Sequence, residues 1–289
     1  MAALRPLTGT AALLALLAIG AGGCGSSGGG DTSTAAPAES TAAPAASTAA
    51  NTSFPDQGDM KVTFEEPANQ DDADAKDLLQ QTGSVSDVVK LVNQTVVLPN
   101  DTRIVFTSTD DGTGPFYDPA TKQIMFPYPF VSFIANTFAD NEPDITAEDL
   151  ATATDNSVVW ILLHEMSHAL VDQLELPVLS KEEDVADNIA TVLLSLIGTE
   201  GGDIALAGAD LFGYLQQDPS KLTESAFWDE HSLDLQRANE TACLVYGSDP
   251  TAFAGLESSI PAERRDRCPA EWEQISSGVS QVLDPYLKP

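Results

Sequence analysis

One short segment holds the residues of this sequence that are best suited to chemistry. Residues 164–168 read His-Glu-Met-Ser-His, in the middle of the apolar run VVWILLHEMSHALVDQLEL. Residues four apart lie above one another on a helix, so the imidazoles of His164 and His168 can reach one cation. Glu165 lies beside that face, where its carboxylate can take a proton from a water at the metal. The motif predicts a metal centre with Glu165 as catalytic base; the alternative is two buried histidines satisfied by hydrogen bonds alone.

Zinc held by two imidazoles needs a third protein ligand, and acidic residues follow the motif in LSKEEDVADNIATVLL. Glu183 and Asp187 share one helix face there, and the order HExxH, Glu, Asp resembles the gluzincin pattern. The resemblance implies Glu183 as third ligand and Asp187 as the acceptor for the free ring N–H of His164, a bond that fixes the tautomer of a ligating imidazole. Residues 180–183 also read S-x-x-E, a capping box that would occupy Glu183 and leave the metal to Glu182, Asp184 or Asp187.

The chain has only 3 histidines, and the third, His231, lies in FWDEHSLDLQR. In gluzincins a histidine from a later helical segment, oriented by an acid, donates to the oxyanion. The resemblance therefore implies a catalytic role for His231, with Asp229 or Asp234 orienting it and Arg237 as another possible donor. Two alternatives stay open from the residues alone: a polar histidine at a helix start, or the third ligand of the metal.

A longer set of motifs points to one bacterial family. HE-x-x-HAL, EED-x-AD and EHSLD-x-QR follow Tyr117-Asp118-Pro119 and the strand-like Gln123-Ile124-Met125. Together they resemble a family of metallopeptidase-like proteins of largely undescribed function, over most of residues 60–289. The resemblance implies one Zn²⁺ ion and hydrolysis of a peptide or protein substrate. The competing hypotheses are a degenerate, non-catalytic metallopeptidase that serves as an envelope binding or scaffold lipoprotein, and a hydrolase of non-peptide amides.

The N-terminal segments predict export and anchoring. Residues 1–23 contain Arg5 followed by the apolar run 11–19, typical of a signal peptide, and small residues lead into Cys24 as in a lipobox. A lipidated Cys24 would hold the protein on the extracytoplasmic face of a bacterial cell membrane. Residues 24–58 are mostly Ala, Gly, Ser, Thr and Pro, which predicts a disordered tether. The alternative is an ordinary signal peptide that is cleaved nearby and leaves Cys24 as a free thiol.

The remaining residues, 59–289, predict a single acidic domain. The chain carries 44 Asp and Glu against 13 Lys and Arg, a net charge of -31, which excludes nucleic acid as a partner and limits membrane contact to the lipid anchor. Hydrophobic residues make up 43% of the chain, enough for a core. Because the chain is exported, Cys243 and Cys268 are expected to form a disulfide, the alternative being two free buried thiols.

The pattern of the domain predicts an α+β fold that positions these residues. Short β-rich runs at 61–65, 103–107 and 122–125 predict a small N-terminal β-sheet with an edge strand. Because Pro127 and Pro129 cannot donate ladder hydrogen bonds, the third run is expected either to be that edge, where it could hold an extended peptide, or to end there. One helix is expected at 77–92. From about residue 156 onward a mainly helical, zincin-like half is expected, with the HExxH segment on its first helix. The predicted helices of this half are 157–175, 181–197, 204–216, 230–246 and 269–287.

Overall fold

The computed structural model describes residues 54–289. The predicted signal peptide, Cys24 and tether residues 24–53 lie outside the described residues. The last residues assigned to the tether contact the domain: the amides of Gln57 and Gly58 donate to the carbonyl of Leu98, and the ring of Phe54 meets Tyr286 edge-on. Within the described residues, no helix has both the length and the apolar character needed to cross a membrane.

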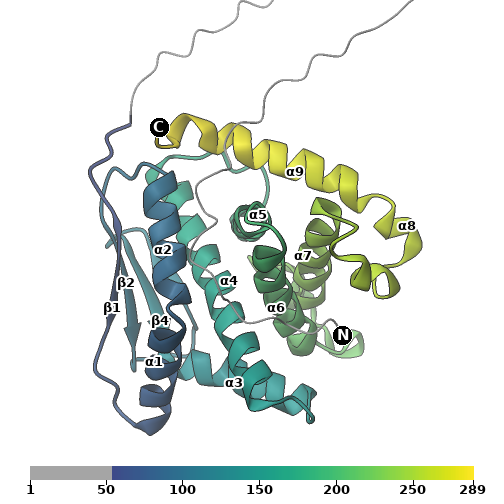
Figure 1. Ribbon diagram of the computed structural model, residues 1–289, viewed down its shortest axis with the longest axis horizontal. Coiled ribbons are helices and arrows are strands. Elements are labelled where there is room, and N and C mark those ends of the chain that lie inside the picture. The colour runs from purple at the N-terminus through teal and green to yellow at the C-terminus, as the bar shows by residue number, and fades with distance from the viewer. Residues whose placement is uncertain (1–53) are drawn as a thin grey trace, which may run out of the picture. The chain divides into compact units, whose positions relative to one another are not determined.

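A small mixed sheet forms the N-terminal part of the domain (Figure 1). Its strands are β1 (Met60–Phe64), β2 (Thr102–Thr107), β3 (Phe116–Asp118) and β4 (Gln123–Pro127), in the order β1-β2-β4-β3. β1, β2 and β4 are parallel, and β3 is antiparallel to β4. The third run was predicted to be an edge strand or to end at the prolines: it does end at Pro127, but it is not an edge, because β3 pairs with it. β3 is only three residues long and lies among turn formers, so its residues show no strand pattern.

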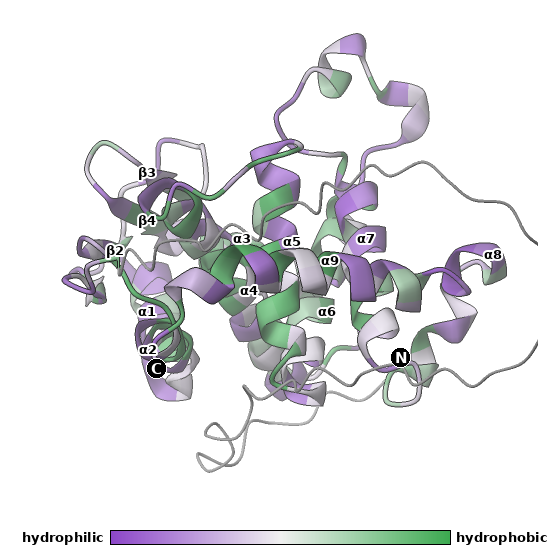
Figure 2. Cartoon of the chain, turned by 90° about the horizontal axis from the view of Figure 1, so that it is seen from above, coloured by the Kyte–Doolittle hydropathy of each residue, from purple (hydrophilic) through white to green (hydrophobic). Residues whose placement is uncertain are grey.

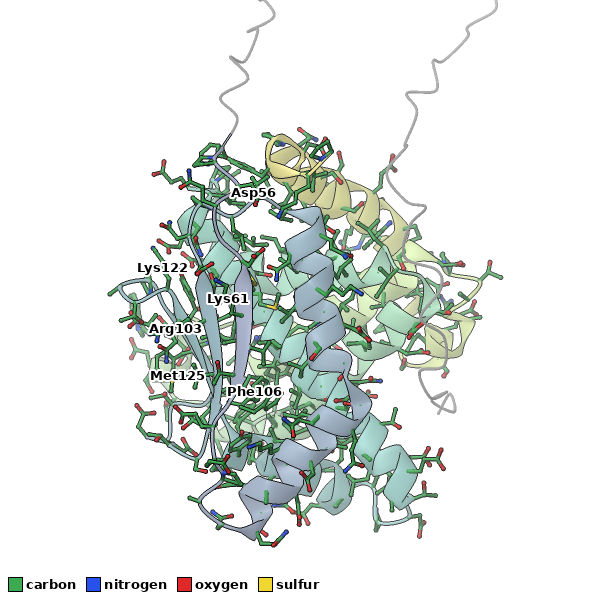
Figure 3. The ribbon with its side chains drawn as sticks, turned by 60° about the vertical axis from the view of Figure 1, so that its left-hand side comes forward. Asp56, Lys61, Arg103, Phe106, Lys122 and Met125 are labelled. Atoms are coloured by element: carbon green, nitrogen blue, oxygen red, sulfur yellow. A yellow bond between two sulfur atoms is a disulfide. The ribbon has the colours of Figure 1, made fainter. Side chains whose placement is uncertain are left out.

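The two faces of the sheet differ as strand alternation requires. Ile104, Phe106, Ile124 and Phe126 are fully buried and face the helices, whereas Arg103 is exposed on the opposite face. Figure 3 shows Phe106 on the helix side of the sheet and Arg103 with Met125 on the outer side. The sheet therefore has one solvated face and one face that rests on the helical half.

The rest of the described domain is helical. Its α-helices are α1 (Gln70–Thr82), α2 (Ser84–Thr95), α3 (Tyr128–Asn141), α4 (Ala147–Gln173), α5 (Glu182–Ser195), α6 (Thr199–Leu215), α7 (Asp234–Ser248), α8 (Ala262–Arg265) and α9 (Cys268–Leu283). Together with the sheet they confirm the α+β class. α4 is central: α2 and α3 pack on it from the side of the sheet, and α5 and α6 pack on it from the other side (Figure 1). Hydrophobic residues are concentrated on α4 and its neighbours (Figure 2).

Three helical predictions needed correction. The single helix predicted at 77–92 is two helices that meet at Gly83, whose φ of 74° lies in the left-handed region that glycine tolerates best. α3 was missed because Pro129 suggested an extended chain, yet it occupies the first helical turn, where a missing N–H costs nothing. α4 begins at Ala147, well before the predicted start at residue 157, with the Thr146 side chain accepting from the Asp149 amide as an N-cap.

A disulfide joins the last two long helices, as predicted. Cys243 of α7 and Cys268 of α9 are bonded with their Cα atoms 5.2 Å apart, within the usual range for a disulfide. Both residues are fully buried. The bond therefore ties α9 to the helix that follows His231.

Candidate metal centre

Three segments that are distant in sequence supply the site. α4 carries His164, Glu165 and His168 in its C-terminal half, and α5 presents Glu183 from its first turn. His231 lies in the loop that precedes α7. The prediction placed His231 within a helix, but α7 begins only at Asp234, so His231 belongs to an irregular segment. The structure thus brings together all five residues for which the sequence predicted ligand or catalytic roles.

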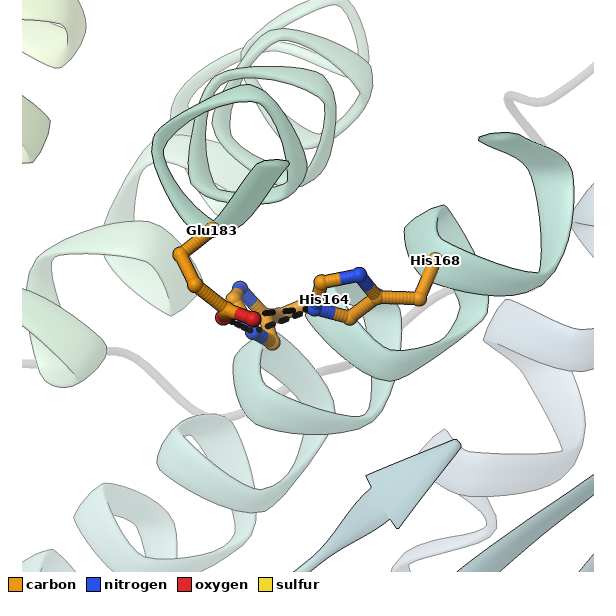
Figure 4. Close-up of side chains that lie close together, drawn as sticks. All are labelled: His164, His168 and Glu183. Atoms are coloured by element: carbon orange, nitrogen blue, oxygen red, sulfur yellow. Dashed lines mark hydrogen bonds and ion pairs between the residues drawn. The ribbon is translucent and has the colours of Figure 1, made fainter. Parts of the chain in front are cut away.

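The ligand atoms of His164, His168 and Glu183 all lie within 4.8 Å of one another (Figure 4). The Nε2 atoms of His164 and His168 are 3.2 Å apart, and they lie 3.2 Å and 3.3 Å from Oε2 of Glu183. Nε2 of His231 reaches the same oxygen at 3.0 Å, but His231 is not one of the three residues in that compact group. In this arrangement His231 contacts the Glu183 carboxylate from outside that group of three.

Each imidazole of the site has a carboxylate at its other nitrogen. Nδ1 of His164 lies 2.7 Å from Asp187 Oδ1, and Nδ1 of His168 lies 2.9 Å from Glu182 Oε1. Nδ1 of His231 is 3.3 Å from Asp229 Oδ1. A neutral imidazole that donates from Nδ1 keeps a lone pair on Nε2, which is the form that binds metal. In that form the Nε2 lone pairs of His164 and His168 would face the carboxylate of Glu183.

The donor set fits a divalent cation. Oε2 of Glu183 is buried and within ion-pair distance of three imidazoles, yet it accepts no hydrogen bond from the described residues. Burial alone would raise the pKa of Glu183, but the contacts with the imidazoles of His164, His168 and His231 bring this pKa well below its usual range. A buried carboxylate oxygen that accepts no hydrogen bond, with two imidazole Nε2 atoms beside it, offers the donor types of a zinc ligand set.

The capping box at residues 180–183 does not form. The N-cap of α5 is Lys181, without a side-chain capping bond, and the carboxylate of Glu183 turns to the histidines instead. The other acids considered as metal ligands are also engaged elsewhere: Asp184 accepts from Ser232 Oγ at 2.7 Å, while Glu182 and Asp187 accept from the histidines. The capping-box alternative is therefore wrong.

A buried arginine holds Asp187 in place. Nε and Nη2 of Arg237 donate to the two oxygens of Asp187, each at 2.8 Å, and the guanidinium lies 4.0 Å from the ring centroid of Phe212. Burial acts to raise the pKa of Asp187, but the bonds with Arg237 and His164 bring it down to about 2. Asp187 therefore stays ionised as the acceptor for His164. Arg237 was predicted as a possible oxyanion donor, but two of its three guanidinium nitrogens donate to Asp187 instead.

Glu165 lies on α4 where the helix passes the sheet edge. Its side chain is buried, and the backbone of Tyr117 in β3 lies close to its carboxylate. Burial raises the pKa of Glu165, although the neighbouring histidines oppose this effect. A carboxylate with a raised pKa is suited to exchanging protons near neutral pH. The contact with β3 was invisible in the sequence because β3 itself was.

An HExxH helix whose imidazoles converge with a carboxylate from the next helix, beside a buried glutamate, defines a candidate hydrolytic metal centre. The family model DUF4344, described as "Putative metallopeptidase", matches residues 64–283. The chain therefore belongs to this metallopeptidase-like family, and the match includes every residue of the site. No curated protein and no solved structure gives a significant match to the chain.

Proposed function

We propose that this protein is a zinc-dependent peptidase of the gluzincin type, with His164, His168 and Glu183 as the metal ligands. The observation that carries the proposal is the convergence of these three ligand atoms within 4.8 Å of one another. The buried residue Glu165 directly follows the ligand His164 on α4. When bound, the zinc ion supplies a Lewis acid that activates water and polarises a carbonyl group.

The protein's own groups then have distinct tasks. The carboxylate of Glu165 accepts the proton of the attacking water and passes it to the leaving amine, helped by its raised pKa. Nε2 of His231, 3.0 Å from the ligand oxygen of Glu183, would donate to the oxygen on which charge develops, and Asp229 orients its ring through Nδ1. Asp187 and Glu182 keep the ligating imidazoles in the correct tautomer.

The sheet offers a place for an extended substrate. Within residues 54–289 the outer edge of β3 has no strand partner, and the backbone of Tyr117 in this strand lies close to Glu165. A peptide that adds to β3 as a further strand would have its backbone held beside the proton-accepting carboxylate. This replaces the strand 123–127 as the candidate peptide-binding edge, because β4 is paired on both sides.

The cellular location is a further part of the proposal. A signal at residues 1–23 and lipidation of Cys24 would place the domain on the extracytoplasmic face of a bacterial membrane, where the disulfide between Cys243 and Cys268 is stable. Cys24→Ser is expected to move the protein from the membrane fraction to the soluble fraction. An unchanged distribution would contradict lipid anchoring.

The test of the activity compares Glu165→Gln with Glu148→Gln, an exposed glutamate on the same helix. Zinc content is measured by elemental analysis, and hydrolysis is measured on a mixed peptide library by mass spectrometry. We expect about one zinc per chain in the wild type and both variants, with hydrolysis reduced by about 10²–10⁴ in Glu165→Gln only. A wild type that binds no zinc, or full hydrolysis by Glu165→Gln, would overturn the proposal.

A further inference from the structure

The segment that carries His231 has little to hold it in place by packing. Between α6 and α7 the chain forms two short 3₁₀ turns, Pro219–Lys221 and Glu224–Phe227, neither of which contains a buried residue. Phe227 and Trp228, the largest side chains just before His231, are 65% and 82% exposed. A loop without buried apolar contacts has low local stability. Its position must therefore depend on the polar contacts that it makes.

Those contacts converge on the start of α5. Nζ of Lys181 donates to the backbone carbonyl of Asp229 at 2.9 Å and to that of His231 at 3.0 Å. Ser232 Oγ donates to Asp184 at 2.7 Å, and His231 Nε2 meets Glu183 at 3.0 Å. The start of α5 thus carries the candidate metal ligand Glu183, and the residues on either side of it, Lys181 and Asp184, form hydrogen bonds with the loop that contains His231.

Lys181 is the contact that fixes the backbone on both sides of Glu230. A single ammonium group that donates to two carbonyls two residues apart limits both the distance of the loop from α5 and its rotation relative to that helix. Because Lys181 donates a hydrogen bond to the backbone carbonyl of His231 itself, it fixes the backbone position from which the imidazole side chain extends. The contact of His231 with Asp229 orients only the ring, because both residues move with the loop.

We propose that Lys181 is a positioning residue that latches the loop before α7 onto α5 and so holds His231 beside the ligand carboxylate. The inference rests on the proposed function for its effect on turnover, but the latch itself is a property of the loop. Lys181 touches neither the ligand atoms nor Glu165, so its removal leaves the metal site intact. Its effect on catalysis passes through His231.

The test uses Lys181→Met, which keeps the aliphatic stem and removes the donor. Lys181→Arg restores donors and charge, and Lys221→Met is the matched control, since Lys221 lies in the same loop with an 80% exposed side chain. Zinc content, kcat and KM on a cleaved peptide, and amide hydrogen exchange of residues 225–232 are measured for each. We expect unchanged zinc content, kcat lower by about 10–10²-fold and faster exchange in Lys181→Met. Lys181→Arg recovers most of both, and Lys221→Met behaves as wild type.

A double variant separates positioning from general weakening. If Lys181 acts through His231, Lys181→Met lowers kcat no further in a His231→Phe background, because the group it positions is already gone. Additive losses, or wild-type kcat and exchange in Lys181→Met, overturn the proposal. If the wild-type protein cleaves no peptide, the proposed function fails. Amide exchange then decides the latch alone: unchanged protection of residues 225–232 in Lys181→Met refutes it.

Discussion

Arg237→Met tests whether the buried arginine supports the metal centre through Asp187. Arg237 is 8% exposed, donates two 2.8 Å bonds to Asp187, and lies over the ring of Phe212. Methionine fills a similar volume against that ring, so the change removes charge and donors without leaving a large cavity. What remains is a buried carboxylate with His164 as its main partner.

The expected loss follows from that remaining charge. Breaking a buried ion pair by removing one partner costs about 3–5 kcal/mol. We expect the lower end, about 3 kcal/mol, because Asp187 keeps its 2.7 Å contact with His164 and methionine keeps the packing. For a domain of this size that corresponds to a fall in Tm of about 6–12 °C. Loss of support for the ligand His164 is expected to weaken zinc binding by about 10–100-fold.

Urea unfolding gives the free energy of unfolding, and competition with a chelator gives the zinc affinity. The control is the double variant Arg237→Met/Asp187→Asn, in which no buried charge is left unpaired and the asparagine side chain still offers an oxygen to His164. We expect the double variant to be more stable than Arg237→Met alone. A loss below about 1 kcal/mol in Arg237→Met, or a double variant that is less stable still, would refute the reasoning.

The other predictions concern the ligand set, one buried acid and the disulfide. Glu183→Ala should lose zinc, whereas His231→Phe should keep zinc and lose about 10²–10³ in turnover; the reverse pattern of zinc contents would exclude the ligand assignment. Burial raises the pKa of Asp155 despite two hydroxyl donors, so the protonated form favours folding and its stabilisation disappears as pH rises. Asp155→Asn should therefore be more stable than wild type at about pH 7–8 in urea unfolding, with the gain vanishing near about pH 4, and a less stable variant at the higher pH would contradict this. Replacing Cys243 and Cys268 by alanine should lower the free energy of unfolding by about 3 kcal/mol, measured beside reduced wild type, and unchanged stability would count against a structural bond.

The fold could be predicted from the sequence where local patterns were strong. The paired histidines lie in a long apolar run that predicted a buried helix. The helical patterns that follow it, after the short β-rich runs, predicted a small sheet and a helical half. The prediction failed where a short or proline-bearing segment depends on its neighbours. β3 has three residues and is a strand only because β4 lies beside it. α3 tolerates Pro129 because this residue falls in its first turn, and no local pattern in the sequence indicated that a helix begins at Tyr128.

The site divides in the same way. The i, i+4 spacing of His164 and His168 determined by itself that both imidazoles share one face, because helical geometry is set within a single turn. Tertiary structure decided between the capping box and the histidines for Glu183, since that choice depends on how α5 packs on α4. Tertiary structure also determined that Arg237 pairs with Asp187, which lies 50 residues away in sequence. Such partners are set by the packing of helices and by burial, which leaves each charge only the neighbours that the fold brings to it.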